Sequence, residues 1–136
     1  MKSMSPEIII IDDDPINNII CTQQIKRKAP DIKIVDFISP LHGLSYITDE
    51  HSQRSSASKT ILLLDINMPV MTGWEFLDRF DTLCIDIKNN FMIYILSSSF
   101  DPIDKNGAKT NPLVKDFISK PLTEGVIITL LKELRK

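Results

Sequence analysis

The sequence predicts an α/β fold of the flavodoxin-like, doubly wound kind: a five-stranded parallel sheet of order 2-1-3-4-5 with helices on both faces. The first observation is that short apolar runs alternate along the chain with longer segments of helical periodicity. The second is that the runs 8–11 and 61–64 are apolar at every position, which is typical of strands buried on both faces. Right-handed crossovers then leave few topologies, and 2-1-3-4-5 is the natural order for five strands.

Length, charge and cysteine usage together favour a single cytoplasmic domain. The chain has 136 residues, enough for one domain (1–136) whose core needs no disulfides. Cys21 and Cys84 lack metal-ligand spacing and lie in apolar segments, so both are expected to be reduced and at or near the core. The net charge of −2 gives no basic surface for nucleic acid. No apolar stretch resembles a signal peptide or a membrane span, so no membrane partner is expected.

The first strand and the first helix are expected close to the N-terminus. Residues 7–11 form a largely β-branched run that stops at three successive carboxylates. Asp14 has the place of a helix N-cap and Pro15 that of the first helical residue, and Pro30 ends the helix. The apolar residues expected to form the core-facing stripe of this helix are Ile16, Ile19, Ile20 and Ile25.

The remaining elements follow from the same two patterns. Further strands are expected at 32–38, 61–64, 91–96 and 113–119. Further helices are expected at 40–50, 72–83, 102–110 and 123–134. The Ser-rich segment 51–59 is expected to be a surface loop, and 84–90 to be the exit from the third helix. His42 and His51 are too isolated to form a metal or phosphoryl-transfer pair, so both are expected at the surface.

Polar residues follow four of these strands where each strand ends. Asp12 and Asp13 end the first strand, Asp65 the third, Ser97 the fourth and Lys120 the fifth. Ligands of such sheets bind outside the carboxyl ends of the strands, so these side chains are expected to share one site. Clustered carboxylates need a compensating cation, and Mg²⁺ accepts oxygen ligands of this kind. With Mg²⁺ in place, Asp65 could attack a phosphoryl group, while Lys120 and Ser97 share the charge on the phosphoryl oxygens.

These motifs resemble those of the response-regulator receiver domains of two-component signalling, in particular the stand-alone chemotaxis type. The resemblance covers essentially the whole chain, and the motifs occur in the same order on the same elements. They are Ile11-Asp12-Asp13-Asp14, Leu64-Asp65-Ile66-Asn67-Met68-Pro69-Val70-Met71-Thr72-Gly73, Ile95-Leu96-Ser97-Ser98 and Phe117-Ile118-Ser119-Lys120-Pro121.

The resemblance implies a role for each residue of the site. Asp65 would be the phosphoacceptor. Mg²⁺ would be bound by Asp13, Asp65 and the backbone carbonyl of Asn67, with Asp12 helping directly or through water. Lys120 would contact the phosphoryl group, and Ser97 would be the switch hydroxyl that moves toward it. The ring of Phe117 would follow Ser97, as an aromatic switch that has no hydroxyl of its own.

The resemblance also implies partners. The phosphoryl group would come from a histidine kinase or a histidine phosphotransfer protein. The output would pass through protein contacts of the fourth helix, fifth strand and fifth helix, at about 102–134. The chain would not be an enzyme, apart from assisting its own phosphorylation and dephosphorylation.

Two other functions are compatible with parts of the sequence. A phosphatase similar to the haloacid dehalogenases would use the Asp-x-Asp spacing of Asp12 and Asp14 with Mg²⁺. However, Pro15-Ile16 departs from that family's pattern, the chain is short for that fold, and Asp65 would have no role. A pseudo-receiver would keep the fold as a binding module without being phosphorylated, which the intact acidic and basic residues make less favourable.

Overall fold

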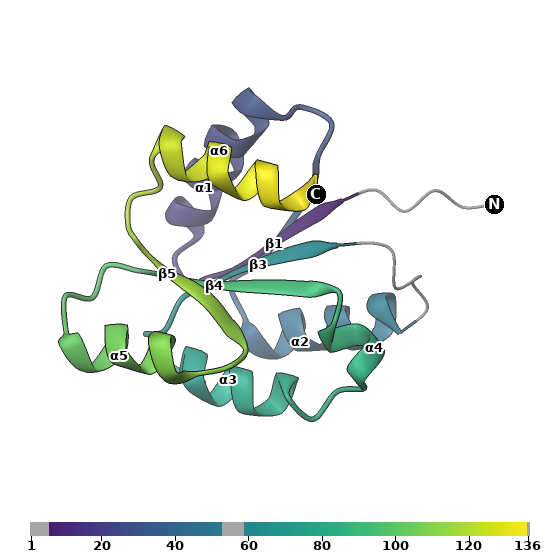
Figure 1. The fold of residues 1–136 in the computed structure, drawn as a ribbon, viewed down its shortest axis with the longest axis vertical. Coiled ribbons are helices and arrows are strands. Elements are labelled where there is room, and N and C mark those ends of the chain that lie inside the picture. The colour runs from purple at the N-terminus through teal and green to yellow at the C-terminus, as the bar shows by residue number, and fades with distance from the viewer. Residues whose placement is uncertain (1–5, 53–58, 136) are drawn as a thin grey trace.

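A computed structural model of the chain describes residues 6–52 and 59–135, which form a five-stranded parallel sheet of order β2-β1-β3-β4-β5 (Figure 1). The strands are β1 (Glu7–Ile11), β2 (Lys33–Phe37), β3 (Thr60–Leu64), β4 (Phe91–Ser97) and β5 (Val114–Ser119). The helices are α1 (Pro15–Lys28), α2 (Pro40–His51), α3 (Gly73–Phe80), α4 (Ile85–Lys88), α5 (Pro102–Thr110) and α6 (Glu124–Leu134). The predicted fold class and strand order are confirmed.

The sheet separates two apolar cores. Helices α1 and α6 cover one face of the sheet, and α2, α3, α4 and α5 cover the other (Figure 1). Successive residues of β1 point to opposite faces, so Ile8 and Ile10 enter the first core while Ile9 and Ile11 enter the second. Burying an isoleucine fully stabilises a protein by about 1.5–3 kcal/mol relative to leaving it exposed. A central strand with four consecutive isoleucines therefore stabilises both layers at once.

Glycine is required where α3 begins. A Cβ built on Gly73 would lie 2.6 Å from the backbone oxygen of Asp65 and 2.9 Å from the Cα of Ile66. Thr72 and Glu75 form a capping box at this helix start, and the Gly73 N–H donates to the Ile66 carbonyl at 2.8 Å. The first turn of α3 is therefore held directly against the backbone that carries Asp65.

The predicted core-facing stripe of α1 is wrong for three of its four residues. Ile16, Ile19 and Ile20 are exposed, whereas the buried residues of this helix are Asn18, Cys21 and Ile25. Ile16 and Ile25 lie nine positions apart, which is about two and a half helical turns, so they are on opposite sides of the helix. Periodicity identified an apolar face, but that face is turned away from the sheet.

Three smaller predictions also need correction. His51 is buried rather than at the surface, because α2 extends to it and its Nε2 lies 2.9 Å from the carboxylate of buried Glu7. Cys84 is exposed rather than near the core, whereas Cys21 is buried as expected. The exit after α3 contains the short helix α4. Most of the predicted Ser-rich loop, 53–58, lies outside the described residues.

Candidate functional site

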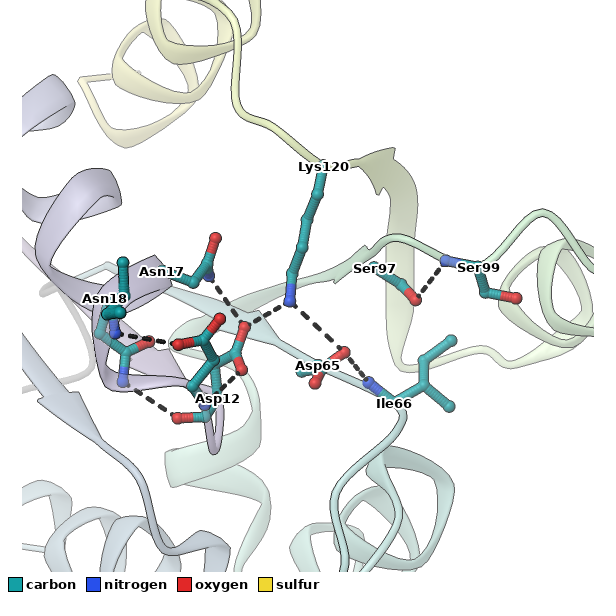
Figure 2. A network of polar contacts seen from close by, with 10 residues as sticks. Asp12, Asn17, Asn18, Asp65, Ile66, Ser97, Ser99 and Lys120 are labelled. Atoms are coloured by element: carbon teal, nitrogen blue, oxygen red, sulfur yellow. Dashed lines mark hydrogen bonds and ion pairs between the residues drawn. The ribbon is translucent and has the colours of Figure 1, made fainter.

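The polar residues predicted at the ends of four strands meet at one edge of the sheet (Figure 2). They are Asp12 after β1, Asp65 after β3, Ser97 at the end of β4 and Lys120 after β5. Backbone hydrogen bonds continue the parallel pairing into this edge: the Asp65 N–H donates to the Ile11 carbonyl, and the Lys120 N–H to the Ser97 carbonyl, each at 2.9 Å. The sheet itself therefore sets the spacing of these side chains.

Asp12 is the most heavily bonded residue of the site. Its Oδ2 accepts from the Lys120 ammonium at 2.6 Å and from the Asn17 amide at 2.8 Å. Its Oδ1 accepts from the Asp14 N–H at 2.9 Å, and its backbone carbonyl accepts from the amide of buried Asn18 at 3.0 Å (Figure 2). Sequence reasoning missed both asparagines. The available signal was two adjacent amide side chains in the first turn of the helix that follows the acidic run.

Asp65 is buried, and this has a strong effect on its charge. Desolvation, followed by the nearby charge of Asp12, raises the pKa of Asp65 to about 6. Lys120, whose Nζ lies 3.9 Å from the Asp65 Oδ1, and the backbone N–H groups of Asn67 and Ile66 act in the opposite direction. The Asp65 carboxylate therefore ionises near neutral pH in a site that only partly compensates its charge.

Lys120 is held as a cation between the two buried carboxylates. Desolvation lowers its pKa, but its hydrogen bond to Asp12 and the charges of Asp65 and Asp12 outweigh that effect, so the pKa of Lys120 is raised. Its ammonium remains charged throughout the range in which Asp65 titrates.

The acidic side chains fit a hard divalent cation. Asp12, Asp13 and Asp65 each offer a carboxylate oxygen, and these three oxygens lie within 4.8 Å of one another. Asp13 is exposed, so such an ion would be accessible to solvent on one side. Asn67 is exposed two residues after Asp65. An all-oxygen donor set with solvent access is what Mg²⁺ prefers.

Ser97 and Phe117 lie on β4 and β5, the two strands that follow β3 in the sheet. Ser97 is buried, and its Oγ accepts the backbone N–H of Ser99 at 3.0 Å (Figure 2). Phe117 is half-buried against the core below α5, and its Cα pairs with that of Ile95 on the neighbouring strand β4. Phe117 is thus on the strand next to that of Ser97, the switch hydroxyl expected from the sequence.

The geometry does not favour the Asp-x-Asp phosphatase. Asp14 is exposed, and its Oδ1 accepts the Ile16 N–H at 3.0 Å as the N-cap of α1. Asp14 therefore has a structural role that accounts for it, and the third carboxylate in the acidic cluster is Asp65.

A buried aspartate, a lysine and a hydroxyl, brought to one edge of a 2-1-3-4-5 sheet by separate strands, define a doubly wound protein of the receiver class. The family model of the response regulator receiver domain matches residues 8–132. The chain belongs to this family of two-component signalling proteins.

Individual relatives agree with this assignment. The cyclic di-GMP phosphodiesterase response regulator RpfG of Xanthomonas campestris is 30% identical over 115 residues, which are 85% of this chain and 28% of that protein. The chain thus spans less than a third of the length of this relative. A two-component response regulator from Cytophaga hutchinsonii has 29% identity and a TM-score of 0.83, with 98% of both chains covered.

Two more distant structures share the fold. A response regulator receiver protein from Dyadobacter fermentans has a TM-score of 0.83 at 21% identity, covering 96% of this chain and 98% of its own. Vibrio cholerae chemotaxis protein CheY4 has a TM-score of 0.70 at 19% identity, covering 97% of this chain and 99% of its own. Within residues 6–52 and 59–135, no helix combines the length and the apolar character that crossing a membrane requires.

Proposed function

We propose that residues 1–136 form a single receiver domain that is phosphorylated on Asp65 in the presence of Mg²⁺. The observation that carries this proposal is the environment of Asp65, a buried carboxylate with a lysine ammonium 3.9 Å away and two further carboxylates beside it. A carboxylate in this setting is a suitable nucleophile for a phosphoryl group, because cations can balance the charge that the reaction gathers.

The reaction that we propose transfers a phosphoryl group from a phosphohistidine. An Asp65 carboxylate oxygen forms a bond to phosphorus while the donor's N–P bond breaks, and the imidazole keeps the electron pair and takes a proton. Lys120 would balance charge on the phosphoryl oxygens. Asp12, Asp13 and Asp65, together with the Asn67 carbonyl, would hold Mg²⁺, which when bound supplies positive charge to the carboxylates and the phosphoryl oxygens.

Ser97 and Phe117 would convert phosphorylation into a change of surface. The Ser97 Oγ now accepts the Ser99 N–H, and it would instead donate to a phosphoryl oxygen on Asp65. The Phe117 ring would move as this hydroxyl moves. The surface of α5, β5 and α6 would then present a different face to a downstream protein.

The donor that fits this site is a histidine kinase or a histidine phosphotransfer protein. The face of α1 that carries exposed Ile16, Ile19 and Ile20 begins two residues after Asp14, beside the acidic edge. A donor that docks on this apolar face could bring its phosphohistidine to Asp65. Exposed apolar patches next to functional sites commonly mark protein contacts.

Mass spectrometry of the intact protein tests this proposal. With Mg²⁺ and acetyl phosphate we expect a single phosphoryl adduct, absent in Asp65→Asn and absent when the metal is chelated. Failure to form the adduct under conditions where Mg²⁺ still binds would favour the pseudo-receiver. Donor hydrolysis that persists in Asp65→Asn would move the chemistry to Asp12 and revive the phosphatase hypothesis.

A further inference from the structure

Ser99 belongs to two sets of hydrogen bonds that meet between Ser97 and helix α5. Its backbone N–H donates to the Ser97 Oγ at 3.0 Å. Its own hydroxyl donates to the Asp104 Oδ2 at 2.6 Å and accepts the Asp101 N–H at 3.1 Å. The position of the Ser97 hydroxyl and the position of the first turn of α5 are therefore linked through a single residue.

The contact with α5 is an unusual form of helix cap. Asp101 is the N-cap, and its carboxylate accepts the Ile103 N–H at 2.9 Å. In a capping box, the acid at the third helical position would accept the N-cap N–H directly. Here the Ser99 hydroxyl lies between that acid, Asp104, and the N–H of Asp101. The cap of α5 is thus completed only while Ser99 keeps its present position.

Helix α5 packs along β5 but buries little apolar surface of its own. Ala108 is its one buried residue, and Ile103 near its start is largely exposed. Close packing from α3 occurs at Gly107, where an added Cβ would lie 3.2 Å from the Trp74 ring. Elements with few buried apolar contacts open at low free energy, so a hydrogen bond to a charged acceptor weighs heavily in such a helix.

We propose that the Ser99–Asp104 hydrogen bond is a latch that holds α5 in its unphosphorylated position, with Ser99 and Asp104 acting as positioning residues for Ser97. This inference rests on the proposed function, in which the Ser97 hydroxyl turns toward a phosphoryl group on Asp65. That turn removes the acceptor of the Ser99 N–H. The loop from Ser97 to Asp101 then rearranges, the Ser99 hydroxyl leaves Asp104, and the first turn of α5 is released.

Trp74 provides a native reporter of the latch, because its ring lies close to α5 at Gly107. Asp104→Ala and Ser99→Ala should each change the Trp74 emission of the unphosphorylated protein in the direction that phosphorylation changes it in the wild type. Hydrogen exchange of the α5 amides should be at least about tenfold faster in both variants, as expected for the loss of one charge-assisted hydrogen bond. Ser99→Thr keeps a hydroxyl at this position and should restore the wild-type values.

Asp86→Ala, which removes an exposed carboxylate from the first turn of α4, is the matched control and should leave α5 unchanged. A second readout is phosphorylation by acetyl phosphate with Mg²⁺. Asp104→Ala should form the adduct about tenfold faster than the wild type, because it no longer has to break the latch.

The outcomes separate this inference from the proposed function. The latch is overturned if Asp104→Ala and Ser99→Ala leave α5 exchange and Trp74 emission unchanged in the unphosphorylated protein. It is also overturned if phosphorylated wild-type protein, identified by its adduct mass, retains full protection of α5. The absence of any adduct would instead refute the proposed function, while the comparison of unphosphorylated variants would still report on the latch.

Discussion

At the scale of single residues, the site depends on how buried charges are compensated. Asp12 has four hydrogen-bond donors to its carboxylate and carbonyl, whereas the Asp65 carboxylate has mainly backbone N–H groups and a lysine 3.9 Å away. The better-bonded carboxylate holds Lys120 in place, and the less compensated one is the group that we propose to be phosphorylated. Such a division between neighbouring acids is a common feature of functional sites.

The raised pKa of Asp65 leads to a prediction about stability. In the unfolded chain an aspartate has a pKa of about 4, and in the fold the pKa of Asp65 is about 6. The ionised form is therefore disfavoured by folding, so this group lowers stability progressively as the pH rises from about 4 to about 6. Without Mg²⁺, Asp65→Asn should be more stable than the wild type by about 1–3 kcal/mol at pH 7.5, and the difference should vanish below about pH 4.

Urea unfolding of both proteins across this pH range measures the difference. Mg²⁺ should stabilise the wild type more than Asp65→Asn, because the ion offsets the same charge. A difference that does not change with pH would contradict this account of Asp65.

Asn17, which sequence reasoning missed, gives a second prediction at this scale. Asn17→Ala removes one donor from the Asp12 Oδ2 and leaves Lys120 as the other. We expect a loss of about 1–2 kcal/mol in the free energy of unfolding, since hydrogen bonds to charged groups are the stronger ones. Asn17→Asp should be worse than Asn17→Ala without metal, because it adds a like charge beside Asp12. The reverse order in urea unfolding would show that the Asn17 contact does not stabilise Asp12.

At the scale of helices and strands, two glycines form a matched pair. Gly73→Ala would place a methyl group 2.6 Å from the Asp65 carbonyl, so the backbone that carries Asp65 must shift. Gly125 is exposed in the first turn of α6, where an added Cβ would meet nothing within 4 Å apart from its chain neighbours and the backbone of its own helix. We expect Gly125→Ala to be neutral or to stabilise by up to about 1 kcal/mol, and Gly73→Ala to destabilise and to slow adduct formation on Asp65. Equal effects of the two substitutions in thermal unfolding and mass spectrometry would contradict the close approach at Gly73.

The two faces of α1 can be distinguished in the same way. Ile25→Ala empties a fully buried position and should cost about 2–5 kcal/mol, whereas Ile19→Ala on the exposed face should change stability by less than about 0.5 kcal/mol. Chemical denaturation of the two variants tests this directly. A large loss of stability in Ile19→Ala would show that Ile19 is packed in the core, as the sequence pattern predicted.

These elements also show what the sequence can and cannot predict. Strands β1 and β3 were found because each contains four consecutive apolar residues, and the acids were found because each run ends directly at a carboxylate. The orientation of α1 could not be found, since two opposite faces both carry isoleucine and only the sheet decides which is covered. Asn17 was missed because its role depends on Asp12, whose position depends in turn on Lys120, 108 residues away in the chain.

At the scale of the whole molecule, a second buried polar group lies at the opposite end of the strands, where β1 begins. Glu7 begins β1, is fully buried, and is bonded by the Tyr46 hydroxyl and by His51 from α2. The ring of His51 also packs against Phe91 with centroids 4.8 Å apart. The sequence did not predict this cluster, because a glutamate at the start of a strand can be recognised as buried only when the residues that bond to it are known.

Removing His51 should affect stability alone. His51→Ala takes one partner from a buried carboxylate and should cost about 1–3 kcal/mol, while His42→Ala at an exposed position should be close to neutral. Formation of the Asp65 adduct with acetyl phosphate and Mg²⁺ should proceed at the wild-type rate in both variants. A slowed reaction in folded His51→Ala would show that the two ends of the strands communicate.

The length of β1 sets how far apart these two polar groups are. Glu7 and Asp12 are separated by five residue steps of an extended strand, or about 16 Å, through a layer of isoleucines. Residues at such a distance that share no partner contribute independently to stability. Substitutions around Asp12 that lower stability could therefore be offset by substitutions around Glu7 that raise it. The chemistry of one end of the sheet and the stability of the fold can thus evolve separately within one small domain.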